Sequence, residues 1–314
     1  MSNFSIHDHE VRLFIILIIA LIFLFLVSVI FSSEKKRKDL SVPSGIVLAP
    51  FKPVAIKAKA AYVYDLRTRT VLFAKEEDRR LPLASLTKIM AALVAQELNP
   101  FYSVIKVDDE ALMAEGDSGL LKGEKWSLEN ILDFSLVASS NDGMRAVALS
   151  LGALSKAGAT SDEIINDFVK EMNRKASELG LKNTYFWNET GLDRSDVKGG
   201  AYGSAKDVNS LMVYALLKHP DMFRATTESR VTIRSLDNHN HTARNTNNLV
   251  NEIPGILASK TGLTETAGGN LTFAFDPELG RPIIVSILGS TEFGRFEDAR
   301  ILVGAVMAYI GNHQ

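Results

Sequence analysis

Ser85 and Lys88 stand three residues apart in the apolar segment 82–93, PLASLTKIMAAL. Residues three apart share one face of a helix, so the serine hydroxyl and the lysine amine can meet. A helix N-terminus favours negative charge on the serine oxygen, and a desolvated lysine near another cation has a lowered pKa and can accept the hydroxyl proton. The pair could form an activated nucleophile, although a capping serine beside a surface lysine gives the same pattern.

Two further short motifs follow along the chain. Ser139 and Asn141 form S-x-N at a predicted helix end in VASSNDG, and residues 260–262 form K-T-G on a predicted strand in ASKTGLT. S-x-x-K, S-x-N and K-T-G are the motif set of class A β-lactamases and penicillin-binding proteins, in which the first serine is the nucleophile. The three motifs in this order favour nucleophilic catalysis over the capping alternative.

The elements that must position these residues indicate an α+β fold. Apolar or alternating runs predict strands at 61–66, 70–74, 255–262, 269–276 and 281–290. Helical patterns, with Ser127 as an N-cap and Gly180 as a stop, are found at 84–97, 126–139, 162–180 and 297–311. Because strands lie near both ends of the domain, we expect the two chain ends to share one sheet.

The start of the chain is not typical of a globular domain. Residues 13–31 are 19 apolar or near-apolar positions without a charge, nearly enough helix to cross a hydrocarbon core of about 30 Å. A cleavable signal peptide would have a shorter apolar region and a cleavage site with small residues. We therefore expect a cytoplasmic N-terminus at 1–12 and an uncleaved transmembrane anchor at 13–32. A linker would follow at 33–58 and a folded domain at 59–314.

Composition and isolated motifs exclude several other functions. The net charge of −2 offers no basic field for nucleic acid, and the absence of cysteine excludes a disulfide scaffold and thiolate zinc sites. GDSG at 116–119 resembles a protease serine motif, but no histidine lies between His9 and His219 to complete the triad. His239 and His241 could share a strand face as metal ligands, but they lie in an asparagine-rich stretch without cysteine and are interpreted as a solvated turn. No metal or cofactor is implied.

Longer segments around the motifs resemble the D-alanyl-D-alanine carboxypeptidases, the low-molecular-mass penicillin-binding proteins of peptidase family S11. The similarity runs from about Ala60 to the C-terminus and includes the segments 168–193 and 245–271. Ser140 departs from the usual glycine, and the chain stops at Gln314 where many members continue into a β-rich domain. The resemblance implies a β-lactamase/transpeptidase-like fold, an antiparallel sheet flanked by helices with a mostly helical subdomain.

The resemblance also implies a reaction. The substrate would be a peptidoglycan stem peptide ending in D-alanyl-D-alanine, and penicillins and other β-lactams would be inhibitors. Ser85 would attack the penultimate carbonyl with Lys88 as proton acceptor, and water would hydrolyse the acyl-enzyme. Ser139 would relay a proton toward the leaving amine. Asn141 would either bind the substrate or orient Lys88.

The remaining residues carried over by the resemblance form a substrate site. Lys260 and Thr261 would hold the terminal carboxylate, and Gly262 would let the strand approach the substrate. The backbone N–H groups of Leu263 and of the nucleophile would stabilise the oxyanion. Arg295 matches a family arginine that would support the carboxylate site, although a surface charge at a helix end is an equal alternative.

Three alternatives concern the activity. A D,D-endopeptidase of the same family breaks a chemically similar bond, so the motifs do not separate it from a carboxypeptidase. A β-lactamase is disfavoured because the region between S-x-N and K-T-G resembles the carboxypeptidases. A non-catalytic penicillin-binding sensor would not need Ser85, Lys88, Ser139 and Lys260 together.

Two arguments conflict on topology. Four basic residues at 35–38 follow the expected anchor and only Arg12 precedes it, which by charge alone places the folded domain in the cytoplasm. Peptidoglycan peptides lie outside the cytoplasmic membrane, and large domains translocate largely regardless of local charge. We therefore expect a single-pass protein of the bacterial cytoplasmic membrane, with its catalytic domain on the outer side.

Overall fold

The computed structural model describes residues 17–18, 54–152 and 158–312. The expected cytoplasmic N-terminus at 1–12 and, apart from Leu17 and Ile18, the anchor at 13–32 lie outside these residues. The chain divides into two compact units, 1–42 and 43–314, and the second contains all the elements considered below. No helix within the described residues is long and apolar enough to span a membrane.

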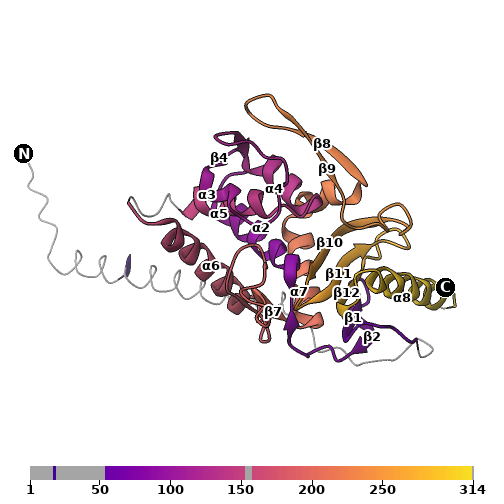
Figure 1. Cartoon of the computed structure of the whole chain (residues 1–314). Coiled ribbons are helices and arrows are strands. Elements are labelled where there is room, and N and C mark those ends of the chain that lie inside the picture. Colours follow the sequence, from indigo (N-terminus) through magenta and orange to yellow (C-terminus); the bar gives the residue numbers. More distant parts are fainter. Residues whose placement is uncertain (1–16, 19–53, 153–157, 313–314) are drawn as a thin grey trace, which may run out of the picture. The chain divides into compact units, whose positions relative to one another are not determined.

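The centre of the second unit is a five-stranded antiparallel sheet with the order β10-β11-β12-β1-β2 (Figure 1). Its strands are β1 (Ala60–Asp65), β2 (Thr70–Lys75), β10 (Ile256–Thr264), β11 (Gly268–Phe275) and β12 (Ile283–Ser290). β1 pairs with β12, which confirms the prediction that strands near the two ends of the domain share one sheet. β1 and β2, which correspond to the first two predicted strands, form an antiparallel hairpin.

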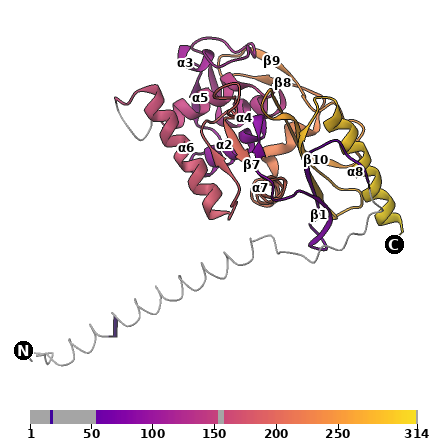
Figure 2. The ribbon, with the colours of Figure 1, turned by 60° about the horizontal axis from the view of Figure 1, so that its bottom comes forward.

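The two faces of the sheet have different partners because successive side chains on a strand point to opposite sides. Val63 stands opposite Val285, which stands opposite Phe273, and this row packs with the apolar side of α8 (Gly294–Gly311). The helix α7 (Ala205–Lys218) covers the other face, so the sheet lies between two helices (Figure 2). Lys260 pairs with Thr272, which pairs with Ser286, so its side chain belongs to the α7 side of the sheet.

A mostly helical subdomain packs beside the sheet. It comprises α2 (Thr87–Leu98), β4 (Val104–Lys106), α3 (Asp109–Leu112), β5 (Lys125–Ser127), α4 (Leu128–Val137), α5 (Asn141–Gly152) and α6 (Ser161–Glu178). Ser127 caps α4 by accepting a hydrogen bond from Asn130 N at 3.2 Å, as predicted. Gly180, with φ +69°, follows the end of α6. The helix predicted at 84–97 differs at its start, because a 3-10 turn, η1 (Ala84–Leu86), precedes α2.

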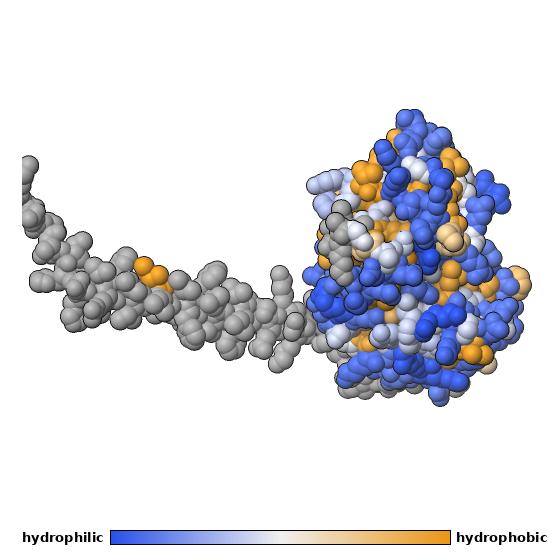
Figure 3. Space-filling view, turned by 60° about the vertical axis from the view of Figure 1, so that its left-hand side comes forward, coloured by the Kyte–Doolittle hydropathy of each residue, from blue (hydrophilic) through white to orange (hydrophobic). Residues whose placement is uncertain are grey.

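Three shorter pieces complete the unit. They are a small sheet of β3 (Leu81–Pro82), β7 (Ala201–Gly203) and β6 (Tyr185–Phe186), the 3-10 segment η3 (Pro220–Thr227), and the hairpin of β8 (Arg230–Arg234) and β9 (Asn240–Arg244). Residues 54–58, the end of the expected linker, pack against the core beside α8, where the backbone N–H groups of Lys57 and Ala58 donate to Asp298 at 2.7 and 2.9 Å. The face of the unit seen in Figure 3 is mainly hydrophilic, with apolar residues in small groups.

The interpretation of both histidines as a solvated turn is wrong for His241. Its Nε2 lies 2.8 Å from Glu124 Oε1, and its ring is 4.9 Å from that of Trp126. The β8–β9 hairpin folds back beside β5 and α4, which brings together residues more than 100 positions apart in the sequence. His239 does lie exposed at the hairpin turn. Within the described part of the chain, no group of three or more His, Cys, Asp or Glu side chains could hold a metal ion.

Candidate active site

The segment that carries Ser85 is held on both sides by backbone contacts. Asn270 Nδ2, on β11, donates to the carbonyl oxygens of Pro82 at 2.9 Å and Leu83 at 3.1 Å. Ala84 has φ +49°, a left-handed conformation that is unfavourable for a residue with a side chain and is often found at active sites. A Cβ on Gly191 would lie 1.9 Å from Ala84 O, so the loop that contains Gly191 packs directly on the backbone of the turn that contains Ala84. Ser85 is thereby fixed between the sheet and the helical subdomain.

Lys88 is fully buried, and its Nζ has three partners. They are Ser85 Oγ at 2.9 Å, Asn141 Oδ1 at 2.7 Å and Thr190 O at 2.9 Å. Asn141 Nδ2 donates to Glu115 O at 2.7 Å, which fixes the amide so that its oxygen faces the lysine. A neutral amine has two N–H groups and one lone pair. The two carbonyl oxygens take the N–H groups, so the lone pair is left to accept the hydroxyl proton of Ser85.

Burial lowers the pKa of Lys88 from 10.5 to about 7, because the charged form loses its hydration. The charge of Glu189 opposes this shift and raises the pKa. Glu189 is itself buried and receives a hydrogen bond from Arg145 Nε at 3.0 Å. Near neutral pH a large fraction of Lys88 is therefore unprotonated and able to act as a base.

A second serine–lysine pair faces the first. Ser139 lies between α4 and α5 with φ +60°, and its Oγ accepts a hydrogen bond from Lys260 Nζ at 2.8 Å. The same amine donates to Thr261 O at 2.9 Å. Burial lowers the pKa of Lys260 well below its usual value, and the positive charges of Lys88 and Arg295 add to this effect. A carboxylate bound next to Lys260 would favour the charged form of this amine, because an opposite charge stabilises the ammonium group.

The end of β10 forms the other wall of the site. A Cβ on Gly262 would lie 2.8 Å from Leu83 O and 3.3 Å from Ser85 N, so a glycine is needed for this close approach. Leu263 follows on the same strand. Arg295 is only 6% exposed and its Nη1 donates to Gly262 O at 2.7 Å, so it is not a surface charge. This buried guanidinium supports the strand that carries K-T-G.

The structure brings the nine predicted site residues together where β10 meets the helical subdomain. Hydrogen bonds link Lys88 to Ser85 and Asn141, and Lys260 to Ser139 and Thr261. Arg295 donates to Gly262, which approaches Ser85 N, and Leu263 follows on the strand. Sequence reasoning missed four residues that support them, namely Glu115, Glu189, Thr190 and Asn270. Asn270 could have been noticed as a polar residue in the apolar strand GNLTFAFD, and Glu189 as an acid within WNETGLD. Glu115 and Thr190 act through backbone carbonyl groups, for which the residue type gives no signal.

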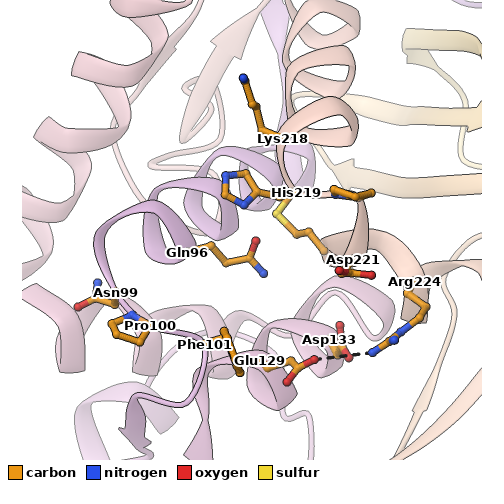
Figure 4. A pocket seen from close by; sticks show the side chains of 12 residues that line it. Gln96, Asn99, Pro100, Phe101, Glu129, Asp133, Lys218, His219, Asp221 and Arg224 are labelled. Carbon is orange, nitrogen blue, oxygen red and sulfur yellow. Dashed lines mark ion pairs between the residues drawn. The ribbon is translucent and has the colours of Figure 1, made fainter.

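A different hollow, of about 420 Å³, lies at the opposite end of α2 (Figure 4). The side chains of Gln96, His219 and Asp133 surround it, and Arg224 pairs with Glu129 at its edge at 3.7 Å. Burial, with a smaller contribution from the charge of Glu129, raises the pKa of Asp133 to about 7. None of the predicted site residues lines this hollow, so it is separate from the cleft.

The fold and the cleft define a serine acyl-transfer enzyme with a β-lactamase/transpeptidase-like architecture. The family described as D-alanyl-D-alanine carboxypeptidase matches residues 47–291, which is most of the chain. The chain therefore belongs to the D-alanyl-D-alanine carboxypeptidase family.

Individual relatives agree with this membership. The chain is 33% identical over 276 residues to the D-alanyl-D-alanine carboxypeptidase DacF of Bacillus subtilis, covering 82% of this chain and 67% of DacF. It is 34% identical over 217 residues to a D-alanyl-D-alanine endopeptidase of Pseudomonas aeruginosa, covering 67% of this chain and 64% of that protein. It thus spans about two thirds of the length of these relatives.

The fold has a solved counterpart. A point mutant of the DD-transpeptidase of Streptomyces K15 superposes with a TM-score of 0.72 at 25% identity, covering 82% of this chain and all of that chain. The expected antiparallel sheet with flanking helices and a helical subdomain is confirmed.

Proposed function

We propose that this chain is a serine-type D-alanyl-D-alanine carboxypeptidase, which removes the terminal D-alanine from peptidoglycan stem peptides. One observation carries the proposal: the buried Nζ of Lys88 contacts Ser85 Oγ and two carbonyl oxygens. On a neutral amine the two carbonyl oxygens take the N–H groups, which leaves the lone pair for the hydroxyl proton of Ser85. The family membership and the relatives named carboxypeptidase support the substrate class.

The reaction begins at the buried serine–lysine pair. Lys88 takes the proton of Ser85 while Oγ forms a bond to the penultimate carbonyl carbon. Backbone N–H groups of Ser85 and Leu263 stabilise the resulting oxyanion, a contribution of about 3–4 kcal/mol per donor in a comparable hydrolase. The C–N bond breaks as Ser139, hydrogen-bonded to Lys260, passes its proton to the leaving amine and takes up the proton that Lys88 received from Ser85, which leaves Lys88 neutral again. Water then attacks the acyl-enzyme while Lys88 accepts a proton from it, and Lys88 returns this proton to Ser85 Oγ as the acyl bond breaks.

The other residues of the cleft hold the substrate. The terminal carboxylate lies against Lys260 and the Thr261 hydroxyl, whose Oγ1 is 2.6 Å from Thr246 Oγ1. Arg295 maintains the strand and adds positive charge behind it. Asn141 orients Lys88 through its side-chain oxygen. A penicillin presents the amide carbonyl of its β-lactam ring and, on the fused ring, a carboxylate, so penicillins should acylate the same serine.

A second candidate is a D,D-endopeptidase, which is favoured by the similarity to the endopeptidase of Pseudomonas aeruginosa. Digestion of purified muropeptides, with the products identified by mass, separates the two. Loss of one D-alanine from monomeric peptides is the result expected of a carboxypeptidase. Conversion of crosslinked dimers into monomers alone would assign the endopeptidase, and penicillin acylation without any turnover would assign a binding sensor.

We further propose that residues 13–32 anchor the chain in the bacterial cytoplasmic membrane, with the catalytic domain on the outer side. The uncharged apolar run and the location of peptidoglycan support this orientation, against the charge bias of residues 35–38. Protease added to intact spheroplasts should digest residues 40–314. Protection until the cells are lysed would reverse the proposed topology.

A further inference from the structure

The small sheet of β3, β7 and β6 lies beside the nucleophile and has an outer face rich in aromatic residues. Leu81, Phe186 and Ala201 point inward and are buried. Pro82 pairs with Tyr202, and Tyr202 pairs with Tyr185, so these positions share the opposite face. By the same alternation Arg80 and Trp187, two residues before Pro82 and two after Tyr185, belong to this face. It therefore presents three aromatic rings and an arginine to the surface.

The rings on this face contact one another and hold two arginines. The ring centroids of Tyr185 and Trp187 are 4.5 Å apart, and those of Trp187 and Tyr202 are 5.6 Å apart. Arg80 Cζ lies 5.9 Å from the Trp187 centroid and 5.6 Å from that of Tyr202. Arg194 Cζ lies 5.6 Å from the Trp187 centroid. We call Arg80, Tyr185, Trp187, Arg194 and Tyr202 the basic aromatic face.

Both guanidinium groups are available to a ligand. Within the described residues, neither Arg80 nor Arg194 forms an ion pair, and both side chains are exposed. A guanidinium held over an aromatic ring keeps the N–H groups at its edge free, and their planar arrangement matches a carboxylate. Trp187 is 36% and Tyr185 is 44% exposed, which is high for large aromatic residues. The chemistry of the face therefore suits an anionic group on a larger molecule.

A hollow of about 600 Å³ connects this face with the end of β10. Its lining includes Arg194 and Leu263, together with the acidic residues Glu115, Asp193, Asp196 and Glu265. Leu263 directly follows the K-T-G motif, and the carbonyl of Glu115 receives the hydrogen bond from Asn141. A substrate extending away from Ser85 along this hollow would reach Arg194 first and then the rest of the face.

We propose that the basic aromatic face binds a carboxylate-bearing part of the peptidoglycan polymer, away from the bond that is cleaved. The inference rests on the proposed function for the identity of the polymer. Charge complementarity at the two arginines supports it, since neither forms an ion pair within the described residues and both could meet carboxylates of the substrate. The acidic side chains Asp193, Asp196 and Glu265 line the hollow itself, so the carboxylate is placed at the face and not in the hollow. Continuity with the hollow that begins at Leu263 favours the substrate over a membrane surface or a protein partner as the occupant.

The test compares binding to the polymer with chemistry at the serine, using the full chain in detergent micelles. The probe is purified peptidoglycan sacculi, and binding is measured by co-sedimentation in a Ser85→Ala background, where no turnover occurs. Arg80→Gln combined with Arg194→Gln is expected to weaken binding about tenfold, since an exposed charge pair is worth up to about fivefold. The difference should shrink at high salt. Arg80→Lys with Arg194→Lys keeps both charges but loses the planar N–H groups, so it should recover only part of the affinity.

Arg79→Gln is the matched control, because Arg79 is the exposed neighbour of Arg80 and takes no part in the ring contacts. It should bind sacculi like the parent chain. Unchanged binding by the double Gln variant would overturn the proposal. So would a parallel loss of penicillin labelling with Ser85 restored, which would indicate a structural role.

Two further measurements distinguish binding of the polymer from binding of a membrane, and failure of the binding face from failure of the proposed activity. The double Gln variant and its parent, with Ser85 present, are assayed on a short acetylated peptide ending in D-alanyl-D-alanine, in neutral micelles and in micelles containing phosphatidylglycerol. A lipid effect that depends on the two arginines would assign the face to a membrane and overturn the proposal. If the parent chain bound sacculi through the face but released no D-alanine from the peptide, the proposed activity would fail while the binding face stood.

Discussion

Lys260 Nζ lies 2.8 Å from Ser139 Oγ, although the two residues are 121 positions apart in the chain. The lysine comes from the central sheet and the serine from the junction of two helices in the helical subdomain. Their contact therefore closes the cleft across the boundary between the two parts of the domain. It also places a second hydroxyl and a second buried amine opposite Ser85 and Lys88, which gives the site separate groups for the arriving and the departing proton.

The first prediction concerns the nucleophile. Ser85→Ala should lose all covalent labelling by a fluorescent penicillin, because no other serine among the described residues has a neutral amine directed at it by two carbonyl acceptors. Lys88→Ala should reduce the acylation rate by a factor of at least ~100, the usual contribution of a positioned base. Labelling is read on denaturing gels. A labelled Ser85→Ala variant would show that another residue is the nucleophile.

A second prediction follows from the lowered pKa of Lys88. Only the neutral amine accepts a proton, so the acylation rate should rise with pH through a midpoint near 7. Glu189 raises this pKa, so Glu189→Gln should move the midpoint to lower pH. Stopped-flow acylation across pH 5–9 measures both. An unchanged midpoint in Glu189→Gln would mean that the carboxylate does not act on Lys88.

The two lysines should also differ in what their loss affects. Lys260→Ala should chiefly weaken recognition of the substrate carboxylate, raising the penicillin concentration for half-maximal acylation about tenfold or more, since hydrogen bonds to charged groups contribute about 1.5–3 kcal/mol. Single-turnover acylation against penicillin concentration measures affinity and rate separately. Wild-type affinity and rate in this variant would rule out the carboxylate role.

Asp133, in the hollow at the far end of α2, should make the fold less stable at alkaline pH. Its folded-state pKa is raised to about 7, so its contribution to stability is present at low pH and is lost as the pH rises from about 4 to about 7. Asp133→Asn should therefore stabilise the domain more at pH 8 than at pH 5, by ~2 kcal/mol in the difference. Thermal unfolding of both proteins at the two pH values tests this. If Asp133→Asn changed the stability equally at both pH values, the carboxyl group of Asp133 would be hydrated in the folded domain.

The turn before the nucleophile should be intolerant of added volume. Gly191 has φ +83°, and a Cβ there would lie 1.9 Å from Ala84 O, which is backbone and cannot rotate away. Gly191→Ala should destabilise the domain by ~2 kcal/mol or more and reduce penicillin acylation at the same time. Gly180→Ala is a useful control, since Gly180 has a similar φ of +69° and open space around it. Acylation should survive in that variant.

The sequence alone determined the motifs, their order and most of the local structure. Ser127 and Gly180 mark the start and the end of their helices as predicted, because capping depends on residues within one turn of the helix end. The pairing of the terminal strands could also be predicted, since the pattern of apolar strands at both ends of the domain leaves few ways to bury them. Ser85 and Lys88 could be paired in advance because three residues of helix set their separation.

Only the tertiary structure decided how the side chains of the motifs are protonated and oriented. The pKa of Lys88 depends on burial and on Glu189, 101 positions away, and the direction of its lone pair depends on the carbonyl oxygens of Asn141 and Thr190. His241 was misread because its partner Glu124 is 117 positions away. Desolvation and hydrogen bonds between distant segments act on whatever the fold brings within a few ångströms, and spacing along one chain does not encode those distances.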